Sequence, residues 1–148
     1  MIKRIRTLLL GGQQTPEANP DDERRAVTAA LLVQAALMDG EFDPAERETV
    51  ERLLASEFDL DTGDIETLIA EAETAVHQSS QLFGFTRTAS EHLDHDARID
   101  LMEMLWSVVY ADGVVHDYES NLMRRIAGLL HVTDRDSAHA RQRAADSR

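Results

Sequence analysis

The sequence predicts an all-α protein, a compact bundle of seven to eight helices. Three observations support this prediction. Apolar residues recur at the three- and four-residue spacing of a helix along most of the 148 residues, and no segment alternates like a half-buried strand. Aromatic residues make up only 5% of the chain, with 7 Gly and 3 Pro. One segment also occurs twice in a constant register, which indicates an internal duplication of a helix–Asp-Gly loop–helix unit.

The repeated segment spans residues 38–46 and returns 73 positions later at residues 111–119. In both copies an apolar helix ends in Asp-Gly, and a second helix begins a few residues later. The same register continues outside the loop. It pairs Leu31 with Met104, Leu32 with Leu105, Ala35 with Val108, Ala36 with Val109, Val50 with Met123, Leu53 with Ile126, and Asp61 with Asp134. We therefore expect two repeats, at about residues 24–78 and 97–145.

The first 20 residues are expected to form a basic amphipathic helix and a linker. Ile2, Ile5, Leu8 and Leu9 share one helical face, and residues 11–20 are polar with Gly and Pro. The apolar run is too short to span a membrane and is followed by no convincing cleavage site. We expect this helix to fold onto the domain, since isolated helices of this length are marginal, with contact to a membrane surface as the alternative.

A helical domain is then expected over residues 21–148. Asp21 or Asp22 can cap its first helix, which is mostly buried and runs to about Met38. The following helices are expected at residues 44–57, 62–77, 81–92, 96–111, 117–130 and 134–145. The helix at 81–92 has the weakest pattern, because it contains Gly84.

The charge of the chain restricts its partners. The net charge is −13, and residues 17–137 hold 27 acidic and nine basic side chains, a net charge of −18. Such a body repels nucleic acid and attracts cations or basic protein partners, although an acidic surface also serves solubility alone. The chain has no cysteine, which excludes disulfides and thiolate sites and fits a reducing cytoplasm, where we expect the protein to reside.

Two further segments concentrate charge. No Lys or Arg lies between Leu53 and Thr86, where seven acids gather: Glu57, Asp59, Asp61, Asp64, Glu66, Glu71 and Glu73. We interpret this run as a solvated face, with a docking surface for a basic partner as the alternative. Residues 91–96 contain His92 and His95 among acids. We interpret them as a helix junction capped by Asp94 or Asp96, with a metal site as the alternative.

The acids of the repeated loops divide into two kinds. Glu46 occupies the third helical position after Asp43-Pro44, and Glu119 occupies the matching position after His116 or Asp117. Both glutamates are therefore expected as helix caps. Asp39 and Asp112 instead follow helix C-termini, where a negative charge is unfavourable by a few tenths of a kcal/mol up to about 1 kcal/mol. Hydrogen bonds to amides of the next turn or a bound cation can offset that cost.

The Asp-Gly-x5-Glu spacing also matches the second half of a calcium-binding EF-hand loop. Its first half is missing, because the first and third ligand positions would be Ala35 and Leu37, or Val108 and Tyr110. These loops are therefore not EF-hands, and a weaker site built from oxygen ligands stays open.

The duplicated helix–Asp-Gly–helix unit, with "VVYADG" before the second loop, resembles the TerB-like family of tellurite-resistance proteins and related domains. The resemblance covers about residues 22–137. It implies an all-helical fold, no established catalytic activity and a role in resistance to tellurite and other stresses. It also implies that loop acids bind divalent metal, which carries over to Asp39, Glu46, Asp112 and Glu119.

The sequence contains no Gly-rich phosphate-binding loop, no nucleophile elbow and no helix with the paired His and Glu residues of a catalytic metal site. We therefore do not expect an enzyme. We expect a non-enzymatic TerB-like domain that weakly binds a divalent cation (calcium, magnesium, manganese or zinc) and engages a protein partner, but no nucleic acid. The alternative is a pure interaction or scaffold module without metal, in which the loop acids serve only as helix caps.

Overall fold

The computed structural model describes residues 20–37, 42–78, 84–112 and 115–147. Within these ranges the chain is helical and contains no strand, which confirms the all-α prediction. In chain order the elements are α2 (Pro20–Ala36), α3 (Pro44–Phe58), α4 (Thr62–Gln78), α5 (Gly84–His92), α6 (His95–Val109), the 3-10 helix η1 (Tyr110–Asp112), α7 (Asp117–Leu129) and α8 (Asp134–Asp146). The helix expected near the N-terminus lies outside the described residues.

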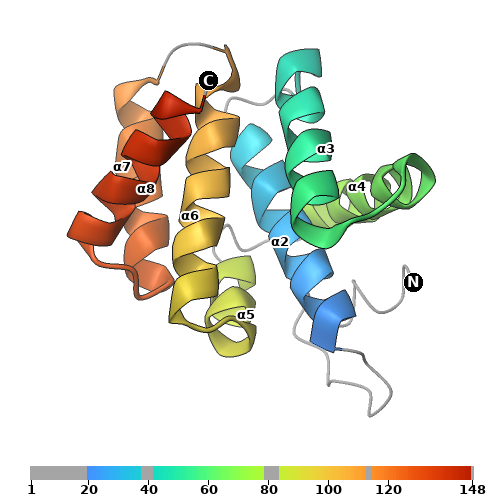
Figure 1. Ribbon diagram of the computed structural model, residues 1–148, viewed down its shortest axis with the longest axis horizontal. Helices are drawn as coiled ribbons and strands as arrows, with labels where there is room; N and C mark the ends of the chain where they lie inside the picture. Colours follow the sequence, from blue (N-terminus) through green and yellow to red (C-terminus); the bar gives the residue numbers. More distant parts are fainter. Residues whose placement is uncertain (1–19, 38–41, 79–83, 113–114, 148) are drawn as a thin grey trace.

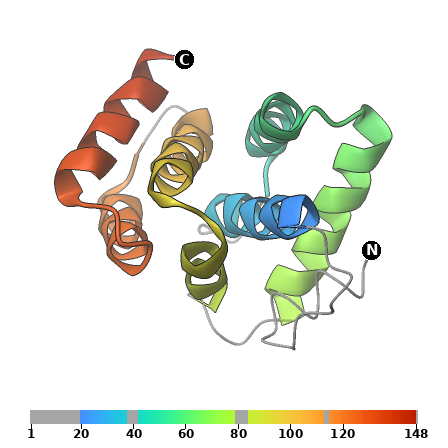
Figure 2. The ribbon, with the colours of Figure 1, turned by 60° about the horizontal axis from the view of Figure 1, so that its bottom comes forward.

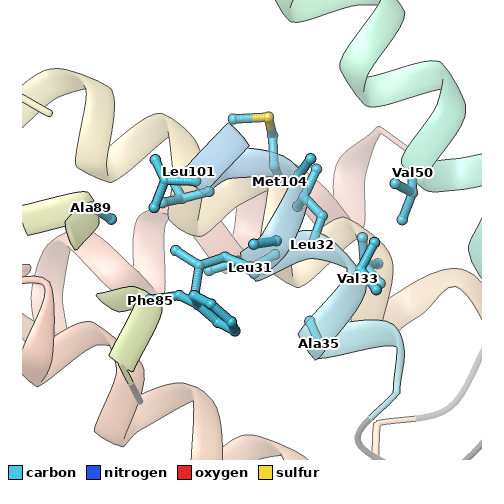
Figure 3. Close-up of a cluster of buried hydrophobic side chains, with 14 of the residues drawn as sticks. Leu31, Leu32, Val33, Ala35, Val50, Phe85, Ala89, Leu101 and Met104 are labelled. Carbon is cyan, nitrogen blue, oxygen red and sulfur yellow. The ribbon is translucent and has the colours of Figure 1, made fainter. Parts of the chain in front are cut away.

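Helix α2 is the centre of the bundle and packs against α3, α4, α5 and α6. Residues 29–33 are at most 1% exposed, so the helix is buried around most of its circumference. Figure 3 shows Leu31, Leu32 and Val33 of α2 among side chains from its neighbours, including Val50 of α3 and Phe85 of α5. The core therefore forms around residues 26–36 of α2, which are apolar except for Thr28 and Gln34.

The helices form two groups around this centre. Helices α2 and α6 lie side by side in the middle, with α3 and α4 beyond α2 and with α7 and α8 beyond α6 (Figures 1 and 2). We call α2–α4 the first unit and α6–α8 the second unit. Helix α5 packs against α2 and α7 and so connects the two units. No helix of the described ranges is long and apolar enough to cross a membrane.

Burial follows the 73-residue register through the first two helices of each unit. Leu32 and Leu105 are both fully buried, and so are Val50 and Met123. Equivalent positions of the two units are therefore buried alike.

The register changes before the third helix of each unit, which corrects the expected match of Asp61 with Asp134. Asp61 caps α4, since its Oδ1 accepts the Asp64 amide at 2.8 Å, but the residue that caps α8 is Thr133. The left-handed residues that end the preceding helices are Asp59 and His131, with φ of 51° and 59°. Asp59 lies two residues before the cap Asp61 and 13 residues after Glu46. His131 likewise lies two residues before the cap Thr133, but only 12 residues after Glu119. The second unit is thus one residue shorter within α7.

Two helix ends also differ from expectation. The helix expected over residues 96–111 is α6, which ends at Val109, because the chain tightens into η1 at Tyr110. The Tyr110 amide donates to the carbonyls of both Trp106 and Val108, as is common where a last helical turn narrows. Helix α2 ends at Ala36, and Met38, its expected last residue, lies outside the described residues.

Candidate functional site

The described residues on either side of both repeated loops lie at one end of the bundle. Helices α2 and α6 run toward that end, and α3 and α7 begin there (Figure 1). We call this region the loop end and define it by its described residues, which are Ala36 and Leu37, residues 42–46, η1 and residues 115–119. The sequence left open whether the two loops share one side of the protein. In the structure the described flanks of both loops lie at the same end, where η1 contacts α3.

The first loop leads into α3 through a complete capping box. Asp43 Oδ1 accepts the Glu46 amide at 2.8 Å, and Glu46 Oε1 accepts the Asp43 amide at 3.4 Å. Pro44 occupies the first helical position, where its missing N–H is of no consequence. Glu46 is only 7% exposed. The cap, which the sequence predicted, therefore holds a buried carboxylate in one orientation at the loop end.

The second loop repeats this arrangement with a different capping residue. Glu119 Oε1 accepts the His116 amide at 3.1 Å, and Glu119 is 8% exposed. The Glu119 amide donates to the main-chain oxygen of His116 at 3.0 Å. The His116 ring stacks on Tyr118 with centroids 5.7 Å apart. Each loop thus ends at a buried glutamate with one oxygen on a cap amide.

The 3-10 helix η1 connects the two units at the loop end. It packs against α3 of the first unit as well as against α6. Tyr110 of η1 accepts a hydrogen bond from Arg141 Nε at 2.9 Å, which ties η1 to α8. Asp112 is the last residue of η1, but its side chain lies outside the description, as does all of Asp39. Of the four predicted metal ligands, the structure therefore describes the side chains of Glu46 and Glu119.

Described side chains alone do not form a metal centre. Among them, no three His, Asp or Glu residues converge closely enough to hold an ion.

Arg47, the basic residue next to Glu46, is held by other groups. Its guanidinium lies 2.9 Å from Glu73 and 3.5 Å from Glu51, and 5.3 Å from the centre of the Phe42 ring. Arg47 is thus directed along α3 and α4 by acids of the first unit.

Residues 25–142 match the family model described as tellurite resistance protein TerB. The chain belongs to the TerB family. No curated protein and no solved structure gives a significant match. The match covers α2 to α8 nearly completely and includes both loops, which agrees with the resemblance carried by the repeated Asp-Gly segments.

The acidic run of this TerB domain is not a uniformly solvated face, which corrects the interpretation of Glu71. Its neighbours Asp61, Asp64 and Glu66 are exposed, but Glu71 is only 5% exposed. Its Oε2 accepts no hydrogen bond from any residue that the structure describes. Burial raises the pKa of the Glu71 carboxyl above its ordinary value.

The segment 91–96 is a helix junction, as interpreted from the sequence. Asp94 caps α6, and its Oδ1 accepts the Ala97 amide at 2.8 Å. His92 lies 3.1 Å from Glu23 of α2, whereas His95 lies 3.7 Å from Asp136 of α8. The two histidines therefore turn to different helices and do not form a shared site.

Sequence reasoning missed the contacts that connect distant helices. Arg47 reaches Glu73 of α4, and Arg141 reaches Tyr110 of η1. No local spacing predicts these pairs, since they depend on which helix faces become neighbours.

Sequence reasoning also missed a hollow of about 280 Å³ between α3 and α4. It is lined by Glu48, Glu51, Arg52, Ala55, Thr62, Ile65 and Glu66.

Proposed function

We propose that this chain is a non-enzymatic TerB domain that serves resistance to tellurite and related stress. In this proposal it binds a divalent cation weakly at the loop end and engages a basic protein partner through its acidic first unit. The observation that carries the proposal is that the described flanks of both loops lie at the same end of the bundle, and that each leads to a buried glutamate.

The aspartates supply the physical reason for a cation. Asp39 and Asp112 follow the C-terminal ends of α2 and α6, where the partial charge of the helix is already negative. A divalent cation between the loops would offset that repulsion for both helices at once. Calcium and magnesium both favour carboxylate oxygens, and all four predicted ligands are carboxylates.

The glutamates can serve as ligands and caps together. A carboxylate offers about four acceptor positions, so an amide hydrogen bond to one oxygen is compatible with metal ligation by the group. Glu46 and Glu119 are 7% and 8% exposed, and an ionised group that is this buried is stabilised by a cation. Their fixed rotamers also reduce the entropy lost on binding. We place the cation among Asp39, Glu46, Asp112 and Glu119.

Manganese offers a direct test, because it broadens the NMR signals of nearby amides. We expect substoichiometric Mn²⁺ to broaden the amides of residues 43, 45–47 and 116–120 first. The amides of residues 64–67, on the exposed acidic part of α4, are the matched control. Earlier or equal broadening at residues 64–67 would show that cations collect on the general acidic surface and would refute a loop site.

The partner surface proposed for this domain is the hollow between α3 and α4. It measures about 280 Å³, and three of its lining residues are Glu48, Glu51 and Glu66. Residues 42–78 hold eleven acids and two bases, which favours a partner with exposed Lys or Arg. Charge reversal by Glu48→Lys and Glu66→Lys should abolish capture of such a partner, whereas Asp134→Lys on α8 should not.

The alternative is an interaction module without metal, which the capping geometry specifically favours. Glu46 and Glu119 both have a complete role in starting α3 and α7, so their presence needs no ligand. The two functions differ in one respect. The module requires the acidic hollow but predicts no cation-dependent change at the loop end.

A further inference from the structure

The second unit contains a hollow whose lining differs from that of the acidic first unit. It has a volume of about 270 Å³ and lies between α7 and α8, with Trp106 of α6 in its lining. Its lining includes Trp106 of α6, Ser120 and Arg124 of α7, and Asp134, Ser137 and Arg141 of α8. Residues on each helix are three or four positions apart, so one face of α7 and one face of α8 turn toward the hollow.

Arg141 is held in place at one wall. Its Nε donates to the Tyr110 hydroxyl at 2.9 Å, and its guanidinium carbon lies 4.6 Å from the centre of the Trp106 ring. Arginine has five N–H donors, four of them on its terminal nitrogens. Those four make no hydrogen bond to any residue within the described ranges. The contacts therefore fix the plane of the guanidinium and leave its outer donors available to a ligand.

Arg124 stands on the other wall. It is exposed and forms neither an ion pair nor a hydrogen bond with a described residue. Between the arginines, the Ser137 hydroxyl is 7% exposed and accepts the Trp106 Nε1–H at 3.4 Å, which leaves its own O–H as a donor. Two arginines and the buried Ser137 thus line one cavity, and Asp134 is the one acidic residue of its lining.

The surroundings favour an anion here despite the charge of the whole protein. Residues 115–147, which contain α7 and α8, hold five acids and five bases, so these two helices lack the excess of acid found in the first unit. The hollow also opens beside the first turn of α8, where the helix dipole favours negative charge. At physiological salt, exposed charges more than about 8 Å away are largely screened, so the local arginines dominate.

We propose that this hollow binds the phosphate group of a small phosphate monoester. A planar carboxylate is satisfied by one guanidinium fork, whereas a phosphate dianion has three outer oxygens for donors on two walls. The volume of about 270 Å³ is near the lower limit of small-molecule pockets, which restricts the ligand to a small one. This site is separate from the loop end and does not depend on a cation.

Trp106 reports on this site directly, because it is the only tryptophan in the chain and lines the hollow. We would titrate the full-length protein, in the presence of chelator, with glycerol 2-phosphate, inorganic phosphate and acetate at constant ionic strength. We expect a saturable change in Trp106 fluorescence with both phosphate probes and at least tenfold weaker binding of acetate. Tighter binding of glycerol 2-phosphate than of inorganic phosphate would identify an ester rather than the free ion as the ligand. A change that never saturates, or one equal to that from potassium chloride, would overturn the proposal.

Arg124→Gln tests the assignment of the site. Because Arg124 is exposed and makes no ion pair with a described residue, the variant should fold like the parent, which far-UV circular dichroism will check. We expect its affinity for glycerol 2-phosphate to fall at least tenfold. Arg135→Gln, on α8 but outside the lining, loses the same charge and should bind normally. Equal affinities of the two variants would refute the proposed site.

Discussion

The two units of this TerB domain share a local architecture but carry different charges. Each has a buried central helix, α2 or α6, and a following helix that begins at a buried glutamate. Yet residues 20–78 hold 16 acids and four bases, whereas residues 95–146 hold nine acids and six bases. Burial and capping therefore determine the helix–loop–helix geometry of both units. The surface charge is not fixed by that geometry, so it can differ between the units and suit different ligands.

The largest effect should come from the central helices. Leu32 of α2 and Leu105 of α6 occupy matched positions, and both are fully buried. Leu32→Ala and Leu105→Ala should each lower the free energy of unfolding by about 2–5 kcal/mol, through lost burial and a residual cavity. Urea denaturation measures both values. A cost below about 1 kcal/mol in either variant would mean that the two helices are not equivalent parts of the core.

The next effect concerns the buried acid of the first unit. Burial raises the pKa of Glu71, so the native state holds this proton at pH values where the unfolded chain releases it. The favourable contribution is complete below the ordinary value of 4.5 and is lost as pH rises through the raised pKa. Glu71→Gln should therefore stabilise the protein at pH 7 and lose that advantage near pH 4.

Glu66→Gln is the matched control for this prediction, since it removes the same charge from an exposed position of α4. Unfolding in urea between pH 4 and pH 8 distinguishes the two. If Glu66→Gln and Glu71→Gln gave the same pH dependence, net charge rather than burial would be the cause.

The caps of α3 and α7 should differ by a smaller amount. The Asp43 side chain accepts the Glu46 amide, but the Glu119 amide donates to the His116 main chain. Asp43→Ala should therefore cost about 1 kcal/mol, whereas His116→Ala should stay within about 0.5 kcal/mol. Thermal unfolding of both variants tests this difference. A larger loss from His116→Ala would assign its side chain a role that the main-chain contact does not explain.

The smallest effect is a gain at the left-handed residues. Asp59 and His131 have φ of 51° and 59°, which favours glycine. Asp59→Gly and His131→Gly should each stabilise the protein by about 0.5–1 kcal/mol, because the strain disappears. Calorimetry can resolve the increase in midpoint. Destabilisation of both variants would show that contacts of the original side chains outweigh the strain.

Much of this fold was predictable because it depends on short-range rules. Apolar periodicity located the helices, and the Asp43-Pro44-x-Glu46 spacing predicted the cap of α3 with its N-terminal proline. The same reasoning correctly interpreted Asp94 as the cap of α6. Each of these features is decided within a few residues of chain.

The features that were not predictable depend on tertiary packing. Asp59 and His131 end their helices in a left-handed conformation without the glycine that usually signals it, so the one-residue change of register was hidden. In the sequence Glu71 is one acid among many in the run from Glu57 to Glu73, and nothing nearby distinguishes it from its exposed neighbours. Only the packing of α4 buries it. Arg124 and Arg141 likewise line one hollow only because of how α7 and α8 pack beside Trp106.

The most direct test of the central claim is thermal unfolding after treatment with chelator, repeated in millimolar calcium, magnesium, manganese and zinc. A ligand that binds only the native state at about one hundred times its Kd stabilises it by roughly 2.7 kcal/mol. We predict a clear upward shift with at least one ion. The shift should be lost in the Asp39→Asn/Asp112→Asn double variant and kept in the Asp64→Asn/Glu66→Gln control. No shift with any ion, or an equal shift in both double variants, would contradict a metal site at the loop end.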